Sequence, residues 1–290
     1  MENYIVRGTA FDGKVRVFAA ESTSFVEEIR ERQQTLPTAT AAVGRASTIG
    51  AMMGTMLKGE QHLTIQIKGN GPIGQIVVDA NAKGQAKAFL HNPQVDLPLN
   101  EIGKLDVRGA VGTQGNLYVT KDLGMKEPYR GASPIVSGEI GQDFTYYFAK
   151  SEQIPSAVAA GVLVDRDQSV KAAGGFIIQI LPGMKDEDIA AIETEINQLQ
   201  TVTAYLDDGM KIEELVKKVL PSFNIMDQIP LSFHCGCSKE RMEKALISLG
   251  EKEINGLIEQ GHAEVVCHFC NDNYTFSKDE LSELLKQATS

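Results

Sequence analysis

The sequence predicts an α+β protein built from three consecutive segments. Residues 1–181 should form a strand-rich N-terminal core with inserted helices, residues 182–230 an amphipathic helical linker, and residues 231–290 a small C-terminal α+β module. Three observations predict this: alternating apolar residues dominate the first segment, helical spacing replaces them after Pro182, and all four cysteines follow Leu231. A chain of 290 residues with 42% hydrophobic and 23% charged residues can bury a sizeable core plus a smaller module.

The first elements carry turn and cap signals. Apolar stretches at residues 6–11 and 15–18 flank Asp12-Gly13-Lys14, which predicts a hairpin. Ser22-Thr23-Ser24 precedes a helical pattern that begins with Phe25, Val26 and Ile29, which predicts a capped helix start. Pro37 opens a second helix, whose small residues suggest close packing against a neighbour: Gly44, Gly50 and Gly54.

Alternation then predicts a series of strands separated by glycine-containing turns. They are expected at residues 62–68, 74–79, 85–90, 107–111, 116–120, 156–164 and 170–181, with a helix at 138–149. The last strand is a nearly continuous apolar run, which indicates burial on both faces.

Beyond Pro182 the pattern becomes helical. Apolar residues at positions 189, 192, 196 and 199 share one helix face, and a second helix should span residues 212–220 before Pro221. The apolar stripe of this linker must rest on another surface. Two interpretations stay open: a helix pair packed permanently on the core, or a mobile regulatory element.

The cysteine pattern is Cys235-Gly-Cys237, then 29 residues, then Cys267-His-Phe-Cys270. Four thiolates can fill the tetrahedral shell of one zinc ion. His234 and His268 are adjacent rival ligands and His262 is a third, but a complete four-cysteine set makes a histidine ligand unnecessary. A module of this size buries too little apolar surface to be stable alone, so a bound metal that links its two ends is expected.

Three functions compete for this site. A purely structural zinc ribbon is the interpretation that the chemistry alone favours. A thioredoxin-like oxidoreductase is disfavoured, because the CxxC pair does not lie in a βαβ unit. In a redox switch, oxidised thiolates would be captured by their neighbours as disulfides, the metal would leave, and the module would unfold.

Charge and hydropathy restrict the partners. The net charge of −10 disfavours nucleic acid as the main ligand. No apolar run is long enough to span a bilayer, and residues 1–7 lack signal-peptide features, so we expect a cytoplasmic protein without a membrane partner. Gly69, Gly71 and Gly74 match a dinucleotide motif but precede a predicted strand, so we expect a turn there and no enzyme activity.

The motifs resemble those of the thirty-three-kilodalton heat-shock protein family, the redox-regulated bacterial holdase chaperones. The resemblance rests on His234-Cys235-x-Cys237, Val266-Cys267-x-Phe-Cys270-Asn271 and Tyr274-x-Phe276, and on core segments including Glu127-Pro128-Tyr129-Arg130-Gly131 and Ala173-Gly174-Gly175-Phe176. It extends over essentially the whole chain, and the four cysteines show no departure.

The resemblance implies a mechanism. The reduced chaperone would hold one zinc ion per chain and be inactive; peroxide and heat would form the disulfides Cys235–Cys237 and Cys267–Cys270, release zinc, unfold the module and loosen the linker. The active form would be a homodimer that binds unfolding client proteins without ATP. Our physical expectation for the client-binding residues, which no motif encodes, is Ile189, Ile192, Ile196, Leu215 and Val219. The alternative is a constitutive binding module with a purely structural zinc ribbon.

Overall fold

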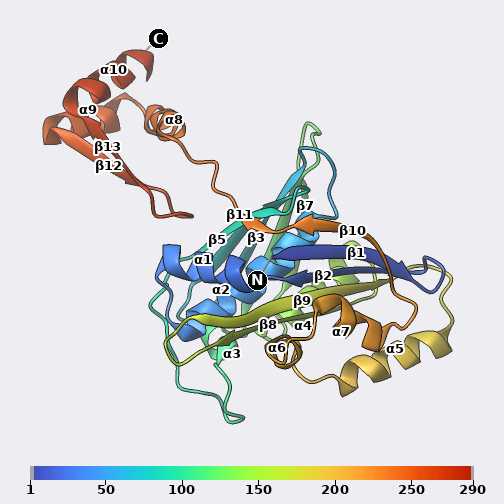
Figure 1. Ribbon diagram of the computed structural model, residues 1–290. Helices are drawn as coiled ribbons and strands as arrows, with labels where there is room; N and C mark the ends of the chain where they lie inside the picture. The colour runs from blue at the N-terminus through green and yellow to red at the C-terminus, as the bar shows by residue number, and fades with distance from the viewer. Residues whose placement is uncertain (1–2, 289–290) are drawn as a thin grey trace. The chain divides into compact units, whose positions relative to one another are not determined.

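The computed structural model describes residues 3–288 and confirms the predicted α+β class (Figure 1). The first sheet has the order β10 (Asn224–Pro230), β1 (Tyr4–Ala10), β2 (Val15–Glu21), β9 (Val170–Ile180) and β8 (Ser156–Val164). The second has the order β11 (Ser232–Phe233), β5 (Gln85–Leu90), β4 (Gln75–Asn81), β3 (His62–Gly69), β6 (Gly115–Asp122) and β7 (Tyr129–Pro134). Neighbouring strands pair antiparallel, except that β11 is parallel to β5.

The chain forms two compact units, residues 1–234 and 235–290. The first also contains α1 (Thr23–Gln33), α2 (Pro37–Gly54), α3 (Val107–Val111), α4 (Gly141–Tyr147), the π-helical turn η1 (Phe148–Glu152), α5 (Asp186–Gln198), α6 (Val202–Asp207) and α7 (Ile212–Val219). The second contains α8 (Lys239–Leu249), α9 (Glu251–Gln260), the hairpin β12 (His262–Val266) and β13 (Asn273–Ser277), and α10 (Lys278–Ala288). None of the described helices is both long and apolar enough to cross a membrane.

Helix α2 packs against both sheets of the first unit. All of its residues except Pro37 and Arg45 are buried. A Cβ added at Gly44 would lie 2.6 Å from Val26 and 2.7 Å from Val162, and one at Gly50 would lie 2.7 Å from Val78. The predicted close packing of this glycine-containing helix is therefore confirmed.

Strand β9 is buried on both faces, as its apolar run predicts. Ala173 and Ile177 face the core that contains α2, whereas Phe176 and Ile178 belong to a second apolar cluster formed with the helices of residues 182–230. Figure 1 shows α6 and α7 on the side of the first sheet opposite α1 and α2. In this structure the predicted linker is thus folded against the core, and its last part, β10, is the edge strand beside β1.

Two local expectations are wrong, and some strands were not expected. Residues 107–111 form helix α3 and not a strand, because Asp106 accepts the backbone N–H of Gly109 and caps a short helix. The side chain of Ser22 bonds to Thr48 at 2.8 Å instead of capping α1. Instead, the side-chain oxygen of Asn3, the residue just before β1, accepts the backbone N–H of Phe25 at 3.1 Å. The sequence patterns also missed strands β7, β10 and β11.

The buried carboxylate of Asp143 organises the turn before α4. It accepts backbone hydrogen bonds from Val136 and Ser137 at 2.8 Å, Ile140 at 3.0 Å and Gly138 at 3.1 Å. Ile140 has φ of 64°, a conformation unfavourable for a β-branched residue, so the carboxylate's bonds hold a strained segment.

We predict that Asp143→Asn lowers the free energy of unfolding by about 2–4 kcal/mol, because the amide keeps one acceptor oxygen and turns an NH₂ group toward backbone donors. Urea unfolding followed by circular dichroism measures the loss. The matched control is Asp12→Asn at an exposed hairpin turn, where the change should stay within about 0.5 kcal/mol. Equal small effects in both variants would contradict the assigned role of Asp143.

Candidate metal centre

Cys235 and Cys237 lie in the segment that precedes α8. Ser238 is the N-cap of that helix and accepts the backbone N–H of Arg241 at 3.4 Å. The Arg241 guanidinium donates to the carbonyl oxygen of Gly236 at 2.6 Å. The first turn of α8 therefore fixes the backbone between the two cysteines.

Cys267 and Cys270 lie in the turn of the β12–β13 hairpin. The backbone N–H of Cys267 donates to Asp272 at 3.0 Å, and that of Asn271 donates to Cys267 at 2.8 Å. Asn271 adopts the left-handed conformation, with φ of 58°, which asparagine tolerates well. Both cysteines of this turn are buried, whereas Cys235 and Cys237 are partly exposed.

The four sulfur atoms converge. All lie within 4.8 Å of one another, with 3.6 Å between Cys235 and Cys267 and 3.2 Å between Cys237 and Cys270. A tetrahedron with zinc–sulfur bonds of about 2.3 Å has edges of about 3.8 Å, so these separations suit four ligands of one ion. They are far longer than a disulfide bond of about 2.05 Å, and the cysteines are free thiols.

The thiols differ in acidity. Burial raises the pKa of Cys235 to about 11, and burial also raises the pKa of Cys270. Burial acts in the same sense on Cys237, but hydrogen bonds from Tyr274 and from the neighbouring thiols outweigh it and lower the pKa. Tyr274 donates its hydroxyl to the Cys237 sulfur at 3.2 Å. Four thiolates at these distances repel one another, and a bound divalent cation would offset their charge.

Histidine does not join the cluster. Within residues 3–288, the convergent group of potential ligands consists of the four cysteines alone. His234, His262 and His268 are exposed, and His234 falls in the first unit. The donor set is therefore all sulfur, which suits zinc and other thiophilic metals and is unsuited to magnesium or calcium.

The apolar core around this centre is small. Its buried members are Leu246, Ala263, Phe276, Leu281 and Leu284. Lys239 lies 5.2 Å from the Phe276 ring centre and pairs with Glu280 at 2.5 Å, which ties the start of α8 to α10. So few buried side chains stabilise a unit of this size only weakly, and a metal clamp at one end would add most of the missing free energy.

The other predicted site residues lie in the first unit. Ile192, Leu215 and Val219 are buried against the first sheet, and Ile189 and Ile196 are half-buried. The glycine motif forms the turn between β3 and β4, as expected.

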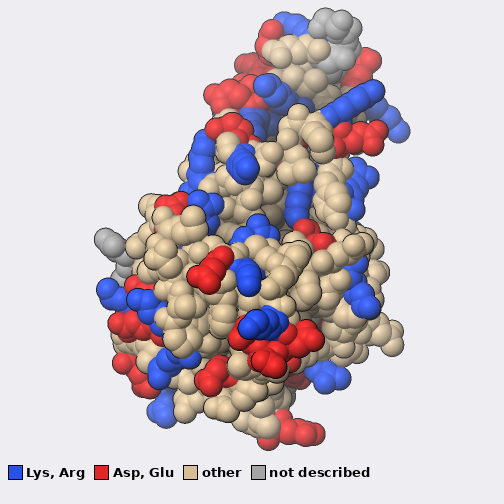
Figure 2. Space-filling model, turned by 90° about the vertical axis from the view of Figure 1, so that its right-hand side faces the viewer, with Lys and Arg blue, Asp and Glu red and all other residues tan. Residues whose placement is uncertain are grey.

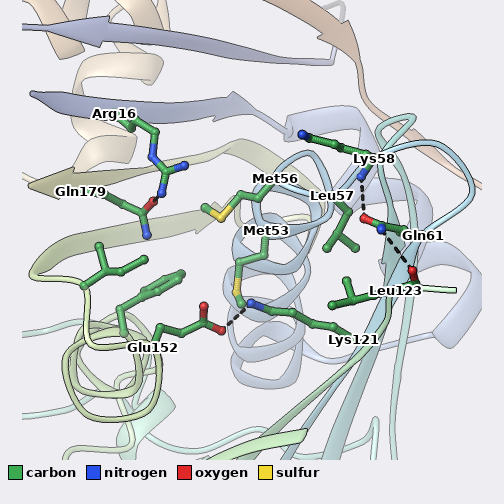
Figure 3. Close-up of a pocket in the computed structure, with 12 residues that line it drawn as sticks. Arg16, Met53, Met56, Leu57, Lys58, Gln61, Lys121, Leu123, Glu152 and Gln179 are labelled. Atoms are coloured by element: carbon green, nitrogen blue, oxygen red, sulfur yellow. Dashed lines mark hydrogen bonds and ion pairs between the residues drawn. The ribbon is translucent and has the colours of Figure 1, made fainter. Parts of the chain in front are cut away.

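Sequence patterns did not indicate a hollow of about 360 Å³ near the end of α2 (Figure 3). Met53, Met56 and Phe148 line it, and Lys121 forms an ion pair with Glu152 at its wall. Because its lining comes from both sheets and from η1, no local motif could have revealed it.

Comparisons with known proteins point to one family. The family model described as Hsp33 protein matches residues 3–277. Proteins named 33 kDa chaperonin are 52% identical in Bacillus subtilis over 99% of each chain, and 51% identical in Staphylococcus aureus over 98% of each chain.

A solved structure agrees over the full length. The crystal structure of the 33 kDa chaperonin (heat shock protein 33 homolog) from Thermotoga maritima has a TM-score of 0.94 and 39% identity, and covers 100% of this chain and 99% of its own. The fold, the cysteine cluster and the near-complete sequence match lead to one conclusion: this chain belongs to the Hsp33 family.

Proposed function

We propose that this protein is a redox-regulated, ATP-independent chaperone of the holdase type. In the reduced, zinc-bound form it is inactive; oxidation forms two disulfides, releases zinc, unfolds residues 235–290 and exposes apolar surface that binds unfolding proteins. The observation that carries the proposal is the convergence of four free thiols in a unit with a very small core, in a chain whose relatives are named chaperonins. Those names denote chaperones and not enzymes.

Cys235, Cys237, Cys267 and Cys270 would hold the zinc ion, which keeps its ligands deprotonated when bound. Each thiolate can attack peroxide: a sulfur–oxygen bond forms, the oxygen–oxygen bond breaks, and hydroxide leaves. A neighbouring thiolate then displaces the second hydroxide and completes the disulfide. Four thiolates and two peroxides thus yield two disulfides and four hydroxides.

Loss of the ligands should unfold the second unit. Structural zinc binding contributes on the order of 10–16 kcal/mol to the folding of small metal-binding modules. The small apolar cluster of five buried side chains, Phe276 among them, cannot replace a contribution of that size. Oxidation therefore converts a local change at four sulfurs into the loss of a whole folded unit.

Unfolding of the second unit can spread to the first unit through the short stretch of chain that connects them. Cys235 follows directly after β11 and His234, and the backbone N–H of His234 donates to Ala86 at 3.0 Å. A single residue separates β10 from β11, and the helices α5, α6 and α7 come before β10 in the chain. Unfolding that spreads back along the chain would first release β11 and then the edge strand β10.

The docked helices cover apolar surface on both sides of the contact. Leu215, Val216 and Val219 pack in one cluster with Val17 and Phe176 of the first sheet. Undocking would expose these side chains together, and we propose that clients bind there, with Ile189, Ile192, Ile196, Leu215 and Val219 as the contact residues on the helices.

One polar contact links the docked helix α7 to the first sheet. The Tyr4 hydroxyl lies 2.8 Å from a carboxylate oxygen of Glu213 on α7 and 3.3 Å from one of Glu21 on β2. Burial raises the pKa of Glu21, and the nearby negative charge of Glu213 acts in the same sense. Docking therefore brings two carboxylates close together around one hydroxyl, whose hydrogen bond to Glu21 acts in the opposite sense on that pKa.

The surface charge supports a protein client over nucleic acid. On the face drawn in Figure 2, Lys and Arg side chains are interspersed with Asp and Glu instead of forming one basic field. Together with the net charge of −10, this disfavours binding to a phosphate backbone.

We further propose that the active form is a homodimer.

Oxidation of the zinc-loaded protein by peroxide at elevated temperature should release about one zinc ion per chain and then suppress aggregation of a heat-unfolded client enzyme. A chromogenic chelator follows the metal, and light scattering follows the client. The control replaces all four cysteines by serine, and its chaperone activity should not respond to peroxide. Zinc release without any effect on aggregation would refute the chaperone function and leave a structural zinc ribbon as the better account.

Peptide mapping of the same samples tests the disulfide pairs. Trypsin cleavage after Lys218, Lys239, Lys252 and Lys278 places Cys235 with Cys237 on one peptide and Cys267 with Cys270 on another. The proposed pairs give two separate peptides, each lighter by two hydrogens. Linked peptides would instead show pairing between the sulfurs that are close in the reduced form, 3.6 Å and 3.2 Å apart.

Leu215→Ala should produce chaperone activity without oxidant. The side chain is fully buried, and its truncation should weaken docking by about 2–5 kcal/mol while the cysteine cluster stays intact. The matched control is Leu117→Ala, equally buried but on β6 in the other core cluster. Light scattering of a client with both reduced variants provides the measurement. Suppression by neither variant, although proteolysis shows the helices of Leu215→Ala released, would exclude docking as the inhibitory contact.

A further inference from the structure

The hydroxyl of Tyr274 reaches the cysteine cluster from β13. Its oxygen lies 3.2 Å from the sulfur of Cys237 and acts as the donor. Tyr274 follows the CxxC turn, whereas Cys237 belongs to the CxC segment more than thirty residues earlier. The contact therefore joins the two cysteine-bearing halves independently of any metal.

The surrounding structure fixes the position of this hydroxyl. Tyr274 pairs with Val265 across the hairpin, and its ring packs against the small core of the second unit. Phe276, two residues further along the same strand, projects to the same side and is fully buried. The ring is thus held by packing while its polar end faces a sulfur.

The contacted sulfur belongs to the more accessible half of the cluster. Cys237 is partly exposed, whereas Cys267 and Cys270 are buried at 7% and 5% exposure. On access alone, an oxidant would meet Cys237 before the CxxC pair. A donor placed at that sulfur acts against this bias, because a hydrogen bond to a thiolate withdraws electron density and reduces its nucleophilicity.

We propose that Tyr274 is a positioning residue that protects Cys237: its hydroxyl hydrogen-bonds to the thiolate, strengthens the hold of the cluster on its metal and slows attack on peroxide. This inference rests on the proposed function and adds the residue that sets how readily the switch responds. In the step that Tyr274 slows, the Cys237 sulfur attacks hydrogen peroxide, one sulfur–oxygen bond forms, and hydroxide leaves. Outer hydrogen bonds of this kind commonly change metal affinity by about 10- to 100-fold.

Tyr274→Phe keeps the ring and removes the donor. A charge-assisted hydrogen bond changes thiolate basicity by about 10- to 100-fold, and nucleophilicity follows basicity with a slope of about 0.4–0.5. Oxidation of Cys237 relative to Cys267 should therefore rise about three- to tenfold. The readout is peptide mass spectrometry after a short peroxide pulse and alkylation, because trypsin separates the two cysteine pairs. Competition with a chelator should show at least about tenfold weaker zinc binding.

The control is Tyr118→Phe, which removes a partly exposed hydroxyl in the first unit and should change neither quantity. Incorporation of fluorotyrosine is a second test with the opposite sign. Tyr274 is the sole tyrosine after residue 234, so fluorotyrosine affects the cluster through this position. Its more acidic hydroxyl is a stronger hydrogen-bond donor and should slow the oxidation of Cys237.

Unchanged relative reactivity and unchanged zinc affinity in Tyr274→Phe, with circular dichroism showing a folded second unit, would overturn the proposal. If the variant does not fold, an unaltered Cys237 rate in the fluorotyrosine protein overturns it as well. Both readouts follow thiols and zinc, not clients. A failure of peroxide to activate the wild-type chaperone would therefore count against the proposed function and not against the role of Tyr274.

Discussion

The convergence of four sulfur atoms is the constraint on which the rest of the account depends. Two short segments, one before α8 and one in the β12–β13 turn, must bring their thiols within 4.8 Å in a unit whose apolar cluster has five buried members. Thiolates this close repel one another, and so small a core offers little to offset that repulsion. A bound cation would reverse this balance, so in the proposed switch metal occupancy and folding of residues 235–288 would become one equilibrium, and oxidation of the sulfurs would act on both.

Strand β9 of the first unit is covered on its two faces by two different apolar clusters. One face of β9 packs in the cluster that contains α2, where the small residues of the helix bring it close to both sheets. The other face is covered by the helices of residues 182–230. The first cluster is built from both sheets and does not need those helices. In the proposed mechanism the protein would therefore lose one cover of the sheet and expose apolar surface, while the first cluster keeps the rest folded.

Much of this could be predicted from sequence because the signals are local. The CxC and CxxC spacings, the apolar run of β9 and the glycines of α2 each report a requirement met within a few residues. The misses have long-range causes. The segment 107–111 is so short that alternating apolar residues do not exclude a helix there. The side chain of Asp106 caps the segment and thereby favours the helix. Asn3 replaces Ser22 as the cap of α1 because β1 brings it near. Neither β10 nor the contact of Tyr274 with Cys237 is visible in any window of the sequence.

The central claim is that the state of the cysteine cluster controls docking of the helices of residues 182–230. Hydrogen exchange followed by mass spectrometry, in the reduced zinc-bound and the peroxide-oxidised protein, tests it most directly. Oxidation should remove protection from residues 235–288 and also from α6, α7 and β10, while α2 and β9 stay protected. Loss of protection confined to residues 235–288, with α6, α7 and β10 unchanged, would contradict the account.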